Sequence, residues 1–492
     1  MFLRFSGRQT VAATFVGALV VLVTTVRTSV GFWDTGDLQT VAWVGGIPYP
    51  TGYPLYAIAG WIWVHAIPIA SVAARLNLLS AVAVALAAAT ICGIALLLEV
   101  RPLFAIPAGW LFAFAHTVWF RSTYADAHTA GFTAALLAIA FGIRWALRAE
   151  RRFVPLAFAT GGIALALDST TVLLLAGGLL LVAARRLPAR AALGGICAAL
   201  AIVAVSYAYL PLRSAQMTAA RADPTLTLGI APGRPFFDDH HPSSPAGFRA
   251  LVGGTEWSAG PTLMRLGTVA SIRRTAEHFV PELVADYSES VVVAALIGLA
   301  FFAVARPIVA LALFFAAIVP ALFGGSYRAE ADPERYVFTL YAVVALGAAL
   351  AAEHALRAVT PARAQIAERL VAVLFAVALA RELVTGRDLY LMRDDQEPAN
   401  VGATVAAMTH DDAIVIAPWD WATPLAYTAY VDHTLGHRIV VCGFVADYAP
   451  MIRGWSRTRQ VVVMAEAPPG IPAMRPRLLV AGNPNLYELV PR

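Results

Sequence analysis

Two carboxylates stand three residues apart in the stretch GFWDTGDLQT, within a segment rich in Trp, Gly and Pro. If residues 33–41 form a helical turn, Asp34 and Asp37 share one face and point together into a cleft, because residues three apart are neighbours on a helix. A carboxylate there can act as a general base that takes the proton from an attacking hydroxyl group. The structural alternative is that Asp34 caps a short helix, since Asp is a favoured N-cap residue.

Two further acidic positions follow later apolar segments. Asp126 lies in RSTYADAH, two residues before His128, and Asp168 lies in LALDSTT. Each of them alone is more often a helix cap than a catalytic group. Together with Asp34 they predict a single polar cavity at one surface of a membrane, because acids at that depth are costly unless they are hydrated, paired or used.

Three arginines offer positive charge for the same cavity. Arg213 follows an apolar segment in YLPLRS, and Arg328 and Arg335 lie in GGSYRAEADPERYVF. A guanidinium group holds phosphate oxygens in a bidentate fork, so we expect Arg213 to bind the phosphate of a lipid carrier, with Arg328 or Arg335 beside it. The structural alternatives are that Arg213 extends toward the lipid headgroups and that the other two form internal ion pairs.

The stretch FFDDHHP combines two acids with two histidines, from Asp238 to His241. Adjacent residues seldom converge on one ion, and no His-x3-His or paired-cysteine spacing accompanies them. We therefore expect no metal ion and no other cofactor.

The elements that must position these groups are apolar. Of the 492 residues, 59% are hydrophobic and only 14% are charged, whereas soluble domains carry about 25% charged residues. Because a spanning helix needs about 20 apolar residues, the pattern predicts an α-helical polytopic membrane protein with about eleven transmembrane helices. The predicted spans are residues 10–30, 77–98, 102–118, 128–147, 153–168, 170–184, 190–210, 290–305, 307–323, 335–352 and 369–385.

Arginine collects in alternate loops between these spans, as it does on the cytoplasmic side of membrane proteins. This bias places the N-terminus in the cytoplasm and residues 31–76 and 211–290 in outer loops, in a multi-pass protein of the plasma (inner) membrane. The net charge of +5 does not indicate nucleic-acid binding, because the arginines cluster between apolar segments. The inner loops hold Arg101, Arg144, Arg148, Arg151, Arg152, Arg185, Arg186, Arg190, Arg306, Arg357, Arg363 and Arg369.

The chain changes character after residue 385. The short β-branched runs AIVIAP, RIVVC, QVVVMA and LLVAG follow one another, and a segment of helical spacing separates the first two. Strands that alternate with helices favour an α/β arrangement with a partly parallel sheet. We therefore predict a transmembrane domain over residues 1–385 and a small extracytoplasmic α/β domain over residues 386–492.

The polar segments as a set resemble one multi-pass membrane family. FWDTGDLQTVAWVGGIPYPTGYPLY, ARLNLLSA, WLFAFAHTVWFRSTYADAHTAGF and YLPLRSA followed by ADPTLTLG are similar to the blocks of the family that includes the transmembrane protein O-mannosyltransferase acting on plexin-type domains. The resemblance covers roughly residues 10–350 and implies the GT-C fold of glycosyltransferases. It also implies a lipid-phosphate sugar donor, inverting transfer and an acidic base in the first outer loop. By position that base is Asp34, and Asp37 stands where the D-x-G-E pattern of the family has Glu.

The chain departs from the family at several positions. Tyr49 and Thr51 replace a His and a Pro, Leu228 replaces a Trp, and Asp168 stands where relatives often have His. The family's E-V-Y becomes Asp126-Ala127-His128. These changes predict an altered pocket for the sugar or the acceptor. The substrate-binding residues that we expect are Arg213, Asp126, His128, Tyr49, Tyr53, Asp168, Arg328 and Arg335.

The hypothesis from the sequence is a membrane glycosyltransferase with Asp34 as its base. It moves a mannose-like sugar from a polyprenyl-phosphate donor in the lipid bilayer to a hydroxyl of an exported protein or glycan. Two alternatives stay open at this point. A flippase or transporter of lipid carriers also has Pro-broken helices and a polar cavity, and the altered motif positions allow a non-catalytic scaffold of the same fold.

Overall fold

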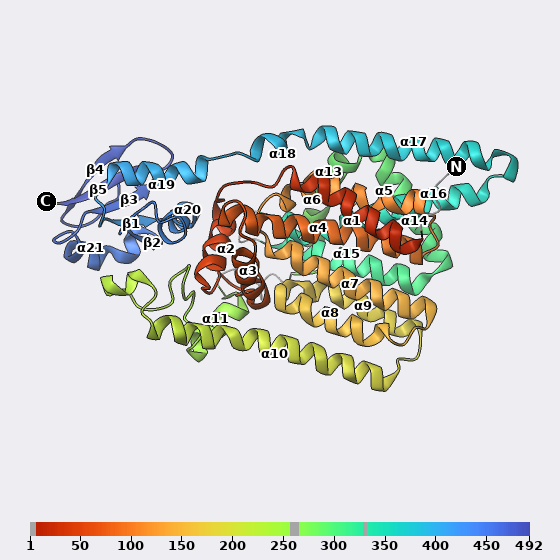
Figure 1. Ribbon diagram of the computed structural model, residues 1–492, viewed down its shortest axis with the longest axis horizontal. Helices are drawn as coiled ribbons and strands as arrows, with labels where there is room; N and C mark the ends of the chain where they lie inside the picture. The colour runs from red at the N-terminus through yellow and green to blue at the C-terminus, as the bar shows by residue number, and fades with distance from the viewer. Residues whose placement is uncertain (1–5, 256–264, 328–331) are drawn as a thin grey trace.

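The computed structural model describes residues 6–255, 265–327 and 332–492. Long helices run side by side through most of the molecule, and a five-stranded sheet lies at the end away from the N-terminus (Figure 1). The long helices and their extensions are α1 (Gly7–Val23), α4 (Val72–Leu97), α5 (Pro102–Phe114), α6 (His116–Ser122), α7 (Ala127–Arg148), α8 (Phe153–Leu167), α9 (Val172–Leu179), α10 (Ala189–Ala219), α13 (Val269–Tyr287), α14 (Glu289–Ala305), α15 (Pro307–Ser326), α16 (Phe338–Ala358) and α17 (Pro361–Thr385).

Shorter elements connect these helices. Three of them are the helices α2 (Trp33–Val44), α3 (Pro54–Ala66) and α11 (Pro245–Gly253). The others are the 3-10 turns η1 (Ser169–Thr171), η2 (Leu180–Ala184), η3 (Pro224–Leu228) and η5 (Pro333–Tyr336). Figure 1 shows α2 and α3, which belong to the predicted first outer loop, between the helical body and the sheet.

The protein is a multi-pass membrane protein, as predicted. Within the described ranges, α4, α7, α10, α15 and α16 are long and apolar enough to cross a membrane, and the number rises from five to seven if the bent pairs α5–α6 and α13–α14 each form one span. All eleven predicted segments fall on helices. The number of helices that meet the length and composition criteria is lower than the eleven predicted spans for two reasons. Helices α1, α8 and α9 are short, and charged residues interrupt α17.

The C-terminal part contains a mixed sheet, as expected from its β-branched runs. The strand order is β2-β1-β3-β5-β4, in which β2, β1 and β3 are parallel and β5 and β4 are antiparallel to their neighbours. The elements are α18 (Arg387–Met392), α19 (Glu397–Met408), β1 (Ile414–Ala417), α20 (Trp419–Tyr430), β2 (Ile439–Cys442), η6 (Val445–Tyr448), α21 (Ala449–Trp455), β3 (Val461–Ala465), β4 (Met474–Val480) and β5 (Asn485–Pro491).

Helix α20 joins the sheet to the helical body by packing on α2. The Tyr427 hydroxyl accepts a hydrogen bond from the backbone N–H of Ala73 at 3.0 Å, and the Trp421 ring meets Phe32 edge to face with ring centroids 5.1 Å apart. Tyr427 shares one buried cluster with Leu38 of α2. The C-terminal part is therefore continuous with the surface that carries Asp34.

Candidate active site

A polar cavity of about 260 Å³ opens between α2, α6, the start of α7 and η5. It lies at the end of the helical body that faces the sheet. Its lining combines six charged side chains with aromatic rings. The lining residues are Arg27, Gly31, Phe32, Trp33, Asp34, Thr35, Leu38, Tyr49, Phe120, Arg121, Tyr124, Ala125, Asp126, His128, Asp332 and Arg335.

Asn77 of α4 ties together the segments that form this cavity. Its side chain is fully buried. The Oδ1 atom accepts hydrogen bonds from Gln39 Nε2 and from the Ala125 backbone, both at 2.8 Å, and its Nδ2 atom donates to the Arg27 carbonyl at 2.9 Å. One amide group therefore fixes α2, the loop after α1 and the loop before α7 relative to one another.

Asp34 lies in the first turn of α2 and faces the cavity. Its Oδ2 atom is 3.2 Å from Arg335 Nη1, and its Oδ1 atom accepts a hydrogen bond from Trp419 Nε1 at 3.2 Å. The side chain keeps 26% of its surface exposed. The carboxylate is therefore held from two sides and remains open to a substrate on the third.

Arg335 connects Asp34 to a second carboxylate, Asp332. Its Nη2 atom is 3.4 Å from Asp332 Oδ2, and Asp332 Oδ1 is 2.8 Å from Nη2 of the buried Arg121. Burial by itself would raise the pKa of Asp332, but the charges of Arg121 and Arg335 outweigh it and hold that pKa below its usual value. Asp332 is thus an ionised bridge between two guanidinium groups.

His128 continues the chain of contacts on the other side of Arg335. Its Nε2 atom accepts a hydrogen bond from Arg335 Nη1 at 3.3 Å, so the proton lies on Nδ1 and is donated to Asp168 Oδ2 at 2.8 Å. The backbone N–H of His128 is capped by Asp126 Oδ1 at 2.7 Å. A continuous polar chain therefore runs from Asp168 through His128 and Arg335 to Asp34.

Two tyrosines form the aromatic wall behind this chain. Tyr49 and Tyr53 are both buried, and their ring centroids are 5.1 Å apart. Tyr53 meets the His128 ring edge to face at 5.8 Å, while Tyr49 approaches Trp419 at 6.0 Å. The structure therefore brings six residues predicted from separate motifs, together with Arg335, to one place: Asp34, Asp126, His128, Asp168, Tyr49 and Tyr53.

Asp37 is an exception, because it does not share a cleft with Asp34. It is fully buried, and its Oδ2 atom accepts a hydrogen bond from the Tyr49 backbone N–H at 3.3 Å. Burial, followed by the nearby charge of Asp239, raises the pKa of Asp37 well above its usual value. Three residues on a helix advance by about 300°, so the Asp37 side chain is rotated by about 60° about the helix axis from that of Asp34. This rotation is enough to turn Asp37 into the protein. A carboxyl group that keeps its proton is unsuited to act as a base.

Arg213 also lies apart from Asp34. Its Nε atom donates to the Gly45 carbonyl at 2.6 Å and its Nη2 atom donates to the Val44 carbonyl at 3.2 Å. These carbonyls belong to the C-terminal end of α2, whereas Asp34 lies at the N-terminal end, about 15 Å away along the helix axis. The structure therefore shows Arg213 as a cap of α2. The other predicted partner, Arg328, lies outside the described residues.

Two residues of this region, Arg27 and Trp419, were not predicted from the sequence. The Arg27 guanidinium lies over the rings of Phe120 at 5.4 Å and Tyr124 at 5.5 Å, and its Nη2 atom is 3.5 Å from Met392 Sδ. Arg27 follows the first apolar segment directly and precedes the Asp34 motif, and that position was a usable signal. Trp419 lies 385 residues from Asp34, and no local pattern announces that contact.

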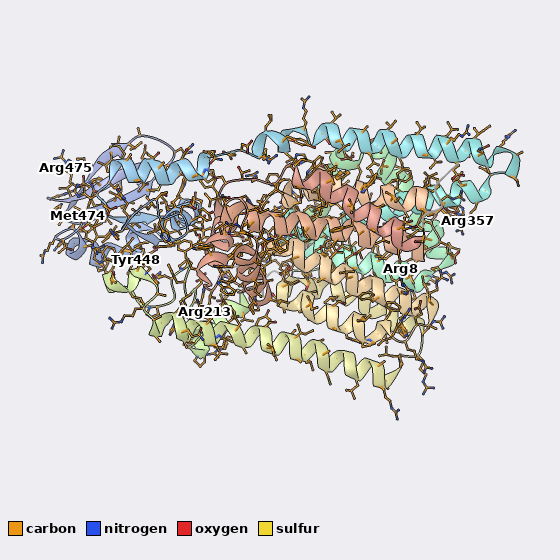
Figure 2. All side chains as sticks on the ribbon, in the orientation of Figure 1. Arg8, Arg213, Arg357, Tyr448, Met474 and Arg475 are labelled. Carbon is orange, nitrogen blue, oxygen red and sulfur yellow. The ribbon has the colours of Figure 1, made fainter. Side chains whose placement is uncertain are left out.

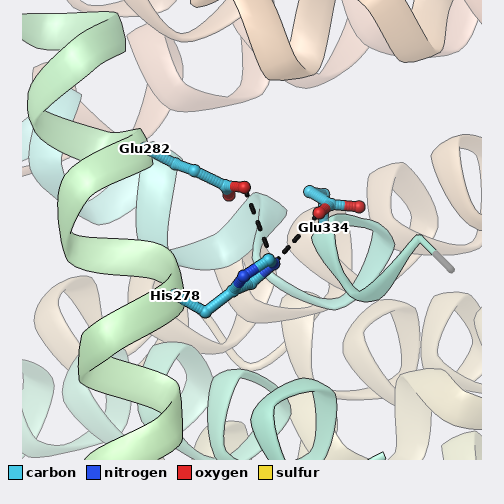
Figure 3. Close-up of side chains that lie close together, drawn as sticks. All are labelled: His278, Glu282 and Glu334. Atoms are coloured by element: carbon cyan, nitrogen blue, oxygen red, sulfur yellow. Dashed lines mark hydrogen bonds and ion pairs between the residues drawn. The ribbon is translucent and has the colours of Figure 1, made fainter. Parts of the chain in front are cut away.

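A histidine and two glutamates lie close together on α13 and η5 (Figure 3). His278 Nε2 is 3.6 Å from Glu282 Oε1 and 3.1 Å from Glu334 Oε1, and one ligand atom from each residue lies within 4.8 Å of the others. Such a set can hold a divalent cation. It is equally satisfied by ion pairs, because Glu334 also contacts Arg121 Nη2 at 3.3 Å.

Residues 34–190 match the family model described as the N-terminal domain of the protein O-mannosyl-transferase TMEM260. The whole chain is similar in fold to ArnT from Cupriavidus metallidurans bound to undecaprenyl phosphate, with a TM-score of 0.51, 13% identity and 97% of each chain covered. It is also similar to the oligosaccharyltransferase of Archaeoglobus fulgidus, with a TM-score of 0.50, 14% identity, and 92% of this chain and 68% of that chain covered. Residues 34–190 therefore resemble a protein O-mannosyltransferase domain, and the chain as a whole shares its fold with ArnT and with the oligosaccharyltransferase.

Proposed function

We propose that the protein transfers a mannose-like sugar from a polyprenyl-phosphate donor to a hydroxyl group of an exported protein or glycan. The observation that carries this proposal is the position of Asp34, which is partly exposed in a cavity that also contains three arginines. The match to an O-mannosyltransferase domain and the undecaprenyl phosphate bound by ArnT support the donor and the acceptor classes.

Asp34 acts as the general base in this proposal. It takes the proton from the acceptor hydroxyl while the acceptor oxygen forms a bond to the anomeric carbon of the sugar. The bond from that carbon to the phosphate oxygen breaks, and the leaving phosphate keeps the electron pair. Attack from the face opposite the phosphate inverts the anomeric configuration. Trp419 and Arg335 keep the Asp34 carboxylate in place during this step.

Arginines of the cavity stabilise the charge that develops on the leaving phosphate. Arg335 is suited to this role because its guanidinium already lies 3.2 Å from Asp34. Arg27 is suited because, among the described residues, its guanidinium contacts a sulfur atom and two rings in place of a carboxylate. Cations that are already fixed in position stabilise such charge without reorganisation. No metal ion is needed in this mechanism.

The residues around His128 are suited to hold the sugar. The imidazole, Asp126 and Tyr49 present polar atoms and an aromatic face to the cavity, and Asp168 fixes the orientation of the imidazole. The lipid chain of the donor extends from the cavity along the apolar helices. With the N-terminus in the cytoplasm, as the arginine pattern indicates, the cavity and the sheet face the extracytoplasmic side.

The purified protein in lipid nanodiscs tests this proposal. The assay incubates it with polyprenyl-phosphate mannose and a Ser- and Thr-containing peptide, and measures glycopeptide by mass spectrometry. General-base catalysis contributes about 10²–10⁴-fold, so we expect Asp34→Asn to lower turnover by at least about a hundredfold. Asp412→Asn, at an exposed position, is the matched control. Wild-type turnover in the Asp34→Asn protein would remove Asp34 from the chemistry, and the same assay with other polyprenyl-phosphate sugars identifies the donor.

A further inference from the structure

A second cavity, of about 280 Å³, lies at the opposite end of the helical body. The C-terminal ends of α4, α7, α14 and α16 surround it. Helix α7 runs from Asp126, at the first cavity, to Arg148 at the second, and its 22 residues span about 33 Å. That length is close to the hydrocarbon thickness of a bilayer, about 30 Å. The two cavities therefore lie at opposite ends of the helical body, about a bilayer thickness apart, and Figure 2 shows Arg357 at this far end.

Three arginines line this cavity: Arg148, Arg306 and Arg357. Glu353 lines it as well, but its carboxylate is already engaged. It is 3.0 Å from Arg101 Nε and 3.1 Å from Arg357 Nε, and Arg101 Nη2 donates a further bond at 3.2 Å. The charge of Glu353 is thus matched within the protein, and Arg357 is partly matched with it.

Arg148 and Arg306 are different, because neither contacts a carboxylate among the described residues. Each lies at the C-terminal end of a helix, where a cation is favoured by the helix dipole. The helix dipole explains why an arginine lies at the C-terminal end of α7 and another at that of α14. It does not explain why both arginines line one cavity. Glu99 is the only other acid in the described lining, so three arginines face two glutamates and the lining keeps a net positive charge.

The cavity is continuous with an apolar surface on α14. The Phe301 ring forms part of the lining, keeps 49% of its surface exposed and stacks on His354 with ring centroids 3.9 Å apart. The large apolar side chains that α14 exposes are Val293, Leu296, Ile297, Phe301 and Val304. A molecule with a phosphate in the cavity can therefore lay hydrocarbon chains along α14.

We propose that this cavity binds the headgroup phosphate of an anionic membrane phospholipid, with Arg148 and Arg306 on the phosphate and the acyl chains against α14. Basic pockets between transmembrane helices bind anionic lipid headgroups, and guanidinium forks match phosphate oxygens. The site is independent of sugar transfer. It lies about a membrane thickness from Asp34 and uses no residue of the first cavity.

Native mass spectrometry of the delipidated, full-length protein tests this site with phosphatidylglycerol as the probe and phosphatidylcholine as the reference lipid. We expect the Arg148→Gln/Arg306→Gln protein to bind phosphatidylglycerol at least tenfold more weakly than the wild type. The matched control is Arg186→Gln/Arg190→Gln, which removes the same charge from exposed positions outside the cavity lining. We expect it to stay within twofold of the wild type. Equal weakening in the two double variants would overturn the site.

Two further measurements distinguish a lipid site from a site for soluble anions and from a folding defect. Glycerol phosphate at millimolar concentration tests for a soluble anion. We expect it not to displace the lipid, and displacement at the same affinity would show that the site does not recognise a lipid. Thermal melting identifies a misfolded double variant, in which case Arg306→Gln alone is compared with Arg190→Gln. The binding assay contains no sugar donor, so its outcome is separate from that of the Asp34→Asn assay.

Discussion

Replacing Trp419 with Phe removes one hydrogen-bond donor from Asp34 and keeps an aromatic ring in its place. The indole N–H is 3.2 Å from Asp34 Oδ1, and it belongs to α20 of the C-terminal part. The ring itself packs against Phe236, with which it is stacked at 6.2 Å, and against Tyr49. Phe preserves much of that packing, so the substitution addresses the hydrogen bond more than the fold.

The size of the effect follows from the surroundings of Asp34. A hydrogen bond to a charged group contributes about 1.5–3 kcal/mol. The Asp34 side chain is 26% exposed and has Arg335 as a second partner, so the low end, about 1.5 kcal/mol, applies. Because about 1.4 kcal/mol corresponds to a factor of ten in rate, we expect kcat/KM to fall about tenfold in Trp419→Phe.

Glycopeptide formation in nanodiscs measures this effect, and Trp421→Phe is the control. Trp421 lies on the same helix and packs on Phe32, while the donor to Asp34 is Trp419. We expect Trp421→Phe to keep kcat/KM within about twofold of the wild type and both variants to melt at similar temperatures. If the two variants lose activity equally, the Trp419 hydrogen bond does not position the base, and the C-terminal part acts on the site only through general packing.

Three further results are expected. Arg335→Lys keeps the charge but loses the planar guanidinium, whose Nη1 atom donates to both Asp34 and His128. Two such bonds at about 1.5 kcal/mol each predict a loss of about a hundredfold in kcat, and a loss below threefold would contradict this. The raised pKa of Asp37 means that the native carboxyl keeps its proton at a pH where the unfolded chain has released it. The wild type therefore loses about 1.4 kcal/mol of free energy of unfolding per pH unit above about pH 4 until the native group ionises. Asp37→Asn should flatten this profile and melt higher than the wild type at pH 7.5, and a lower melting temperature would show that the native group is ionised. Finally, transfer should survive EDTA and His278→Ala, and a loss restored by a divalent cation would contradict the metal-free mechanism.

The sequence alone predicted the membrane body, the C-terminal sheet and the group of polar residues at one end of the helices. These features depend on local properties. Apolar segments in lipid form helices, because their backbone N–H and C=O groups find hydrogen-bond partners only within the segment. Runs of β-branched residues form strands. Asp34, Asp126 and Asp168 each follow an apolar segment, so the ends of those segments were expected to meet at one surface. In the structure Asp126 and Asp168 both contact His128, and Asp34 reaches His128 through Arg335.

Only the tertiary structure decided which of these residues face the cavity. The direction of Asp37 depends on the rotation of α2 about its own axis, which is set by the packing of α2 against α20 and the Asn77 contacts. Arg213 was expected at the phosphate, but carbonyl groups at the end of α2 satisfy it first. The Trp419 contact joins residues from opposite ends of the chain, and such contacts are set by the packing of whole elements, which local composition does not encode.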